Sequence, residues 1–153
     1  MTHSSRNSAS RSQDGQAIVE FALVLPVLLL LVVGMLEFGR AIHYWIDSTH
    51  LANEGARYAA VNRNPGPGGS LAQTLADKGS TSELRDGSAS VTPLQVCIDY
   101  PNGTSAVGDP VRVRATTTYT FIPFMNVLPV TITGEANMRL ERRPDVSIAG
   151  CAS

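Results

Sequence analysis

The sequence has almost no net charge, only two cysteines, and none of the short motifs that mark common enzyme sites. Its formal net charge at pH 7 is −1 over 153 residues, so it lacks the basic footprint of a nucleic-acid-binding protein. It contains no glycine-rich phosphate loop, no Cys-x-x-Cys pair, no serine elbow and no His-Glu-x-x-His motif. We therefore expect a protein that is not an enzyme, requires no cofactor and binds no nucleic acid.

Three residues of metal-binding type lie close together, His43, Asp47 and His50. Spacings of four and three residues place them on one face of a helix, and such side chains can coordinate a metal ion. Two histidines and an aspartate on an amphipathic helix are, however, more often a solvated polar face. We expect no metal site here.

The most informative segment is an apolar run that begins directly after a carboxylate, Glu20. Residues 21–36 are 16 uncharged positions, which rise about 24 Å as a helix. A bilayer core is about 30 Å thick and needs about 20 residues, so a full span includes Ala17 to Glu20. A carboxylate at that depth costs about 2.5–3.5 kcal/mol to insert unless it finds a partner. Glu20 is then either an interfacial residue that reaches water or a functional group inside the membrane.

The residues around Glu20 form a longer pattern. Residues 15–45 read GQAIVEFALVLPVLLLLVVGMLEFGRAIHYW, and residues 52–61 read ANEGARYAAV. A polar leader, a glycine, four residues and a Glu-aromatic pair before an apolar helix resemble the processing site of type IV prepilins. The whole pattern resembles the TadE-like family, pseudopilins of the tight-adherence (Flp) pilus. Flp-type major pilins are much shorter chains and usually have tyrosine where Phe21 stands, so the resemblance is to a minor pilin or pseudopilin.

This resemblance implies that a prepilin peptidase cuts between Gly15 and Gln16, and that Glu20 and Phe21 serve peptidase recognition and assembly. It implies that the chain takes part in assembling a tight-adherence pilus through its N-terminal helix. The implied partners are the prepilin peptidase, other pilins or pseudopilins, the inner-membrane assembly platform and membrane lipid. The implied location is the bacterial inner membrane, crossed once, with the N-terminus in the cytoplasm and the C-terminal domain outside it. The alternative is an unprocessed single-pass envelope protein whose sheet domain binds or scaffolds a partner.

We expect five segments along the chain. The first 15 residues are rich in serine and poor in apolar side chains, so they are predicted to be a disordered leader. Residues 16–37 are predicted to be a transmembrane helix and residues 38–62 its extracytoplasmic amphipathic extension. Residues 63–90 read as a linker with a short helix, Leu71–Lys78, capped by Ser70. Residues 91–153 are predicted to form an antiparallel sheet with a C-terminal tail.

Apolar and polar residues alternate over three stretches, 94–100, 111–121 and 130–141. Alternation of this length predicts antiparallel strands in a sheet with one face turned to water. The other face needs a cover, and small residues at helical spacing between Trp45 and Ala59 provide one. The predicted fold class is α+β, a long N-terminal transmembrane and amphipathic helix packed on a small antiparallel β-sheet.

Charged residues fall on the polar side of these predicted strands. We expect Arg112 or Arg114 to form ion pairs with Glu135 or Glu141 on the neighbouring strand, because opposite charges across two strands attract. The segment between these strands, Ile122–Pro129, is unusually apolar. It either tucks under the helix or is an exposed patch that touches membrane or a partner.

Cys97 and Cys151 both lie beyond the predicted membrane span. An oxidising compartment outside the cytoplasm would favour a disulfide between them, and the alternative is two free thiols. Cys97 falls on the polar side of its strand, and a tail that passes through Arg142–Pro144 can bring Cys151 over the same face.

Overall fold

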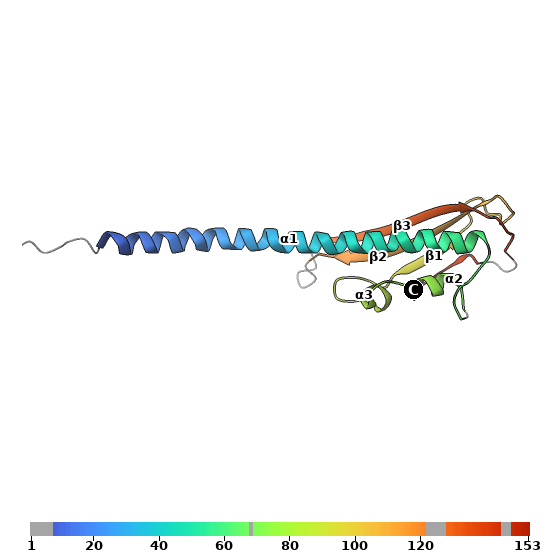
Figure 1. The fold of residues 1–153 in the computed structure, drawn as a ribbon, viewed down its shortest axis with the longest axis horizontal. Helices are drawn as coiled ribbons and strands as arrows, with labels where there is room; N and C mark the ends of the chain where they lie inside the picture. The colour runs from blue at the N-terminus through green and yellow to red at the C-terminus, as the bar shows by residue number, and fades with distance from the viewer. Residues whose placement is uncertain (1–7, 68, 122–127, 145–147) are drawn as a thin grey trace, which may run out of the picture. The chain divides into compact units, whose positions relative to one another are not determined.

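The computed structural model of the chain describes residues 8–67, 69–121, 128–144 and 148–153. It divides into two compact units, Met1–Gly39 and Arg40–Ser153, and each is described by itself. One helix, α1 (Ser8–Ala60), contributes to both units (Figure 1). The helix ends two residues before the predicted end at Asn62, where the backbone takes a positive φ of 50°.

The start of α1 differs from our prediction. The helix begins at Ser8, so residues 8–15 are helical and not disordered as expected. Extending an existing helix adds one hydrogen bond for each residue fixed, whereas starting a new one is unfavourable. A long helix therefore extends into a polar segment that would not form a helix alone. The first seven residues of the predicted leader lie outside the described residues.

The second unit contains a four-stranded antiparallel sheet, which confirms the predicted α+β fold. The strand order across the sheet is β3-β2-β1-β4. The strands are β1 (Gln95–Asp99), β2 (Pro110–Thr120), β3 (Pro129–Arg139) and β4 (Gly150–Ala152). The first three coincide with the predicted stretches to within two residues at each end. The fourth was expected to be tail, because three residues are too few to show an alternating pattern.

The apolar face of the sheet is covered by the C-terminal part of α1, which runs alongside β2 and β3 in Figure 1. The expected stripe of small residues is confirmed for its last four members, which are buried: Ser48, Ala52, Ala56 and Ala59. Small side chains allow the helix to lie close to the sheet. At Gly55, for example, a Cβ atom would stand 2.5 Å from Leu75 and 3.1 Å from Val113.

At the aromatic end of this stripe we expected Trp45 to pack on the sheet, or Tyr44 and Trp45 to lie near the outer membrane interface, and the two residues differ. Trp45 is 55% exposed, and its neighbour Tyr44 is buried instead, at 4%. The ring of Tyr44 packs against Tyr119 of β2, with 5.5 Å between centroids, and its hydroxyl donates a hydrogen bond to Glu83. Burial, together with this hydrogen bond, raises the pKa of Tyr44 above its ordinary value.

Two short helices complete the second unit. The first, α2 (Leu71–Ala76), is capped as predicted, because the Oγ of Ser70 accepts a hydrogen bond from the Gln73 N–H at 3.1 Å. It ends two residues before the predicted Lys78. The second, α3 (Ser82–Asp86), lies in a stretch that we expected to be a linker, and its Leu84 is completely buried.

The side chain of Lys78, which follows α2, reaches back to α1. Its Nζ lies 2.6 Å from Oε1 of Glu54 and 5.2 Å from the centre of the Tyr58 ring. The hydrogen bond with Glu54 raises the pKa of Lys78 and lowers that of the glutamate. This contact holds the end of α2 on the helix.

The charges on the polar face of the sheet pair differently from our prediction. Arg112 contacts Asp99 of β1, with 2.6 Å between Nη2 and Oδ2, and Arg114 lies 3.8 Å from the same carboxylate. Glu135 is the register partner of Arg114 on β3, yet both arginines turn to the β1 side. Asp99 stands directly opposite Arg112 in the β1–β2 register. Its carboxylate accepts hydrogen bonds from both Nε and Nη2 of Arg112, which explains why this arginine pairs with Asp99 and not with β3.

Candidate membrane and assembly site

The predicted processing and assembly residues lie together on one exposed segment of α1. Gly15, Gln16, Glu20 and Phe21 are all exposed helical residues. Nε2 of Gln16 donates a hydrogen bond to Oε1 of Glu20 at 3.1 Å, as expected for side chains four residues apart on a helix. A Cβ atom on Gly15 would meet no atom within 4 Å, so the Gly15–Gln16 bond is open to solvent on its side-chain face.

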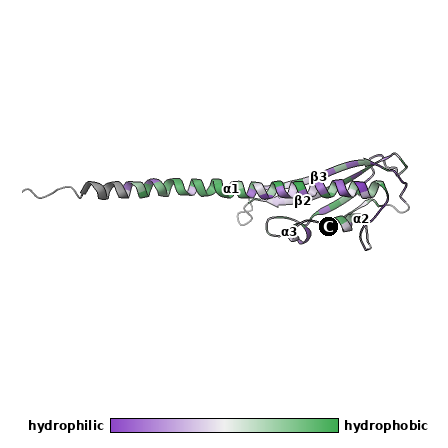
Figure 2. Ribbon diagram, in the orientation of Figure 1, coloured by the Kyte–Doolittle hydropathy of each residue, from purple (hydrophilic) through white to green (hydrophobic). Residues whose placement is uncertain are grey.

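The helix beyond Glu20 exposes a continuous apolar surface. Figure 2 shows this stretch of α1 as an apolar band. Its side chains are between 44% and 73% exposed: Phe21, Leu23, Val24, Val27, Leu28, Leu29, Leu30, Leu31, Val32, Val33, Met35 and Leu36. From Gly15 onward α1 is long and apolar enough to cross a membrane. An apolar surface of this extent marks contact with lipid or with other proteins.

Cys97 and Cys151 are joined in a disulfide with 4.0 Å between their Cα atoms. They are direct partners in the antiparallel register of β1 and β4. The tail therefore extends the sheet beside β1, and does not pass over its polar face as we expected. The disulfide fixes a strand of three residues that has few backbone hydrogen bonds of its own.

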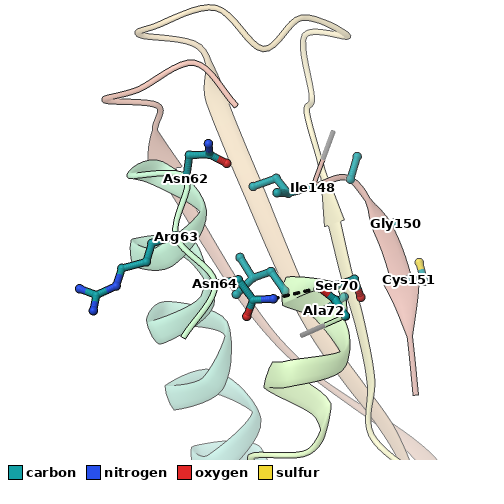
Figure 3. A pocket seen from close by; sticks show the side chains of 11 residues that line it. Asn62, Arg63, Asn64, Ser70, Ala72, Ile148, Gly150 and Cys151 are labelled. Carbon is teal, nitrogen blue, oxygen red and sulfur yellow. Dashed lines mark hydrogen bonds between the residues drawn. The ribbon is translucent and has the colours of Figure 1, made fainter. Parts of the chain in front are cut away.

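A cavity of about 570 Å³ lies between the end of α1, the start of α2 and the segment that leads into β4. Figure 3 shows Asn64 reaching across one side of it, where its Nδ2 donates a hydrogen bond to the carbonyl of Gly69 at 3.0 Å. Arg63, the only charged residue among those that line the cavity, points away from it in this view. The other lining residues are uncharged and include the apolar side chains of Leu71 and Ile148.

The predicted polar face of His43, Asp47 and His50 lies on α1 in the second unit. Asp47 accepts a hydrogen bond from the Ser80 N–H at 3.1 Å, so its carboxylate helps to position the loop before α3. Among the residues that the structure describes, no group of three histidine, cysteine, aspartate or glutamate side chains could hold a metal ion.

Sequence reasoning missed a shallow apolar groove in the second unit. It measures about 440 Å³ and is lined by Ala41, Ile42 and Trp45 of α1 and by residues 130–133 of β3. The alternation of β3 was visible in the sequence, but the side-by-side placement of these two segments depends on the tertiary fold. The apolar connection Ile122–Pro129 was predicted either to tuck under the helix or to form an exposed patch. Its residues 122–127 lie outside the described residues, so this choice stays untested, while Leu128 and Pro129 at its end are exposed.

An exposed apolar helix, long and apolar enough to cross a membrane, continues into a small α+β unit, which fits a membrane-anchored protein. The model of the TadE-like protein family matches residues 15–57, which confirms the resemblance over α1 from the Gly15–Phe21 segment to the buried small residues. The match covers this stretch of α1 and includes none of the strands of the second unit. Comparisons with curated proteins and with solved structures found no match.

Proposed function

We propose that the chain is a minor pilin or pseudopilin that is processed by a prepilin peptidase and assembles into or onto a tight-adherence pilus through its N-terminal helix. The observation that carries this proposal is the exposed Gly15–Phe21 segment at the start of the apolar part of α1, within the stretch that the TadE-like family model matches. In this role the chain is a structural subunit and not an enzyme.

Cleavage between Gly15 and Gln16 requires the helix to open locally, because both residues are helical. Glycine weakens a helix by about 0.5–1 kcal/mol relative to alanine, so Gly15 favours opening at the bond to be cut. Its missing side chain also leaves the bond unobstructed. Cleavage would leave an α-amine on Gln16, whose reference pKa is about 7.7–8.0.

This new amine would need a negative partner if it enters the hydrocarbon region. Glu20 is exposed on the isolated chain and is held there by the amide of Gln16. We propose that in the assembled state the carboxylate instead pairs with the Gln16 amine of a neighbouring subunit. A buried polar pair of this kind can fix the register between two helices, and the apolar side chains beyond Glu20 would supply the remaining contact.

The proposed location is the inner membrane, with the N-terminus in the cytoplasm and the sheet unit on the outer side. Arg6 and Arg11 precede the apolar stretch and fit this orientation. The Cys97–Cys151 disulfide supports it independently, because disulfides persist in oxidising compartments and are rare in the cytosol.

The test is to determine the N-terminus of the protein extracted from the membrane of cells that contain the peptidase. We expect a chain that begins at Gln16, and we expect Gly15→Leu to block cleavage while membrane insertion continues. Gly39→Leu is the matched control, because Gly39 is also a helical glycine with open surroundings, and it should be cleaved normally. A native protein that still begins at Met1 would refute processing and favour the unprocessed envelope protein.

A further inference from the structure

The second unit carries an exposed apolar patch that the proposed assembly through the N-terminal helix does not use. We call it the Trp45 patch, and it consists of Ile42, Trp45 and Ile46 on α1 and Val130 on β3. These side chains are 40%, 55%, 56% and 44% exposed. The groove between Trp45 and the start of β3 is lined only by uncharged residues, so the patch presents an apolar surface together with the indole N–H of Trp45.

The patch lies at the end of the second unit that adjoins the membrane helix in the chain. Counted from Ala17, a span of about 20 residues ends at Leu36, and counted from Phe21 it ends at Arg40. Trp45 follows these two ends by nine or five residues, which is about 14 or 8 Å of helix. The headgroup layer on each side of a bilayer is about 5–7 Å deep, so the backbone of Trp45 lies just beyond this layer by the shorter count and further out by the longer count. Helical side chains lean toward the N-terminus of their helix, so the ring of Trp45 lies nearer to the preceding turn of α1 than its own backbone does.

The pairing of α1 with β3 brings Val130 to the same end. Ile132, two residues further along β3, is buried at 6%, whereas Val130 at the start of the strand is exposed. The exposed apolar part of β3 is therefore confined to the end that faces the first residues of α1 in this unit. Toward the opposite end of the strand Ala136 is only 7% exposed, and Leu140, which follows the strand, is 1% exposed.

We propose that the Trp45 patch rests on the phospholipid headgroup layer of the membrane that α1 crosses. Tryptophan is enriched where an apolar surface meets headgroups, because its ring is apolar and its N–H is polar. This inference rests on the membrane anchoring in the proposed function. It requires neither cleavage nor pilus assembly.

Trp45 is the only tryptophan of the chain, so its fluorescence reports on the patch alone. The full chain is reconstituted into phosphatidylcholine vesicles at high lipid excess, so that neighbouring copies are rare. Three lipids are compared: unbrominated, brominated close to the headgroup, and brominated close to the methyl end of the acyl chain. We expect Trp45 fluorescence to be quenched strongly by lipid brominated close to the headgroup and more weakly by lipid brominated close to the methyl end. Acrylamide in the aqueous phase should quench it little.

The matched control moves the probe to the other end of the unit. Val107 is 65% exposed and precedes Gly108, whose N–H bonds to the carbonyl of Leu140. The double variant Trp45→Phe, Val107→Trp should therefore show acrylamide quenching and no quenching by either brominated lipid. Flotation of both proteins with the vesicles verifies anchoring separately, so a failure of anchoring is distinguished from a failure of the patch to touch lipid.

Two results would overturn the proposal in protein that floats with the vesicles. Trp45 emission that is fully quenched by acrylamide and unaffected by bromine would show a patch in water. Protection from acrylamide without bromine quenching would show a patch covered by protein, either another copy or another part of the chain. A further test repeats the bromine quenching of Trp45 with the Val130→Asp variant. Quenching should be weaker in this variant, because a carboxylate beside the ring opposes contact with the lipid.

Discussion

Gly134 of β3 lies directly against the backbone of Ser48 in α1. The Cβ atom of any other residue at this position would stand 2.3 Å from the carbonyl carbon of Ser48 and 2.4 Å from its oxygen and from the Thr49 nitrogen. These are backbone atoms, which cannot turn aside as a flexible side chain can. The helix and the strand therefore touch at one point where a side chain on the strand has no room.

We expect Gly134→Ala to destabilise the sheet unit by about 1–3 kcal/mol or more, because inserting a methyl group into a packed contact forces the backbones apart. Urea unfolding of the full chain in detergent, followed by circular dichroism, measures the loss. The control is Gly39→Ala, at a helical glycine with no atom within 4 Å of the new Cβ, which should leave stability unchanged or slightly raised. Equal stability of the two variants would contradict the close contact.

The disulfide is expected to contribute about 2–4 kcal/mol to the stability of the sheet unit, because it closes a loop with a sequence separation of 54 residues. Replacing Cys151 by serine should lower the unfolding midpoint and release β4 from β1. Hydrogen exchange at the amides of β1 reports this release, since Val96 and Ile98 pair with β4. A reductant should have the same effect on the parent protein and none on the Cys97→Ser, Cys151→Ser double variant.

The ion pair between Asp99 and Arg112 gives an acid-dependent contribution to stability. The hydrogen bond from Arg112 holds the pKa of Asp99 below its ordinary value. A carboxyl group whose pKa is lower in the folded state than in the unfolded state stabilises the fold at pH values above its unfolded pKa of about 3.9. This stabilisation is lost as the pH falls through the pKa of the folded state. Because the carboxylate is 34% exposed, the contribution is expected to be small.

We therefore expect Asp99→Asn to be slightly less stable than the parent at pH 7, with the difference disappearing as the pH falls through the lowered pKa of Asp99. Unfolding midpoints measured from pH 7 down to pH 2 give this comparison. Glu135→Gln serves as the control, since Glu135 is opposite Arg114 in register but the described ion pairs of both arginines go to Asp99. A larger effect for Glu135→Gln would contradict the pairing seen in the structure.

Glu20→Gln separates the two roles that remain open for this carboxylate. If Glu20 only reaches water at the interface, glutamine should replace it without effect, because it keeps the size and hydrogen bonding. If Glu20 pairs with the Gln16 amine of a neighbour, the amine loses its partner, and breaking a buried ion pair costs about 3–5 kcal/mol. We expect the variant to be inserted and cleaved but to fail in pilus assembly, as measured by piliation of cells.

Glu37→Gln is the companion variant, at the other end of the apolar stretch, and we expect it to have a much smaller effect on piliation. Piliation of the Glu20→Gln strain at the parental level would leave pairing with a neighbour without support. Loss of cleavage, detected by the mass of the extracted protein, would instead assign Glu20 to recognition by the peptidase.

Features that depend on spacing along one element were predictable from the sequence. The Gly15–Phe21 segment is defined by linear distance on a helix, and the alternation of β1, β2 and β3 is defined within each strand. The buried small residues of α1 follow the helical period, so Ser48 to Ala59 were also identified correctly. None of these requires knowledge of which distant segment lies opposite.

Features that depend on a partner from elsewhere in the chain were not predictable. Tyr44 and Trp45 are adjacent and both aromatic, and the choice between them is made by Tyr119 and Glu83. The strand β4 exists because its residues pair with β1 and are tied to it by the disulfide. The charges of the sheet were assigned to the wrong neighbour because cross-strand register and side-chain direction are properties of the assembled sheet.

The contact between Lys78 and Glu54 has a practical consequence for chemical labelling. Lys78 is the only lysine of the chain, and its hydrogen bond with Glu54 raises its pKa. Acylating reagents attack the unprotonated amine, so near neutral pH they should prefer an α-amine with a pKa of about 7.7–8.0. One dye molecule per chain would then report by peptide mapping whether the first residue is Met1 or Gln16. In a chain that begins at Gln16, it would also place a fluorophore at the N-terminal end of the helix without an engineered cysteine, which would endanger the native disulfide.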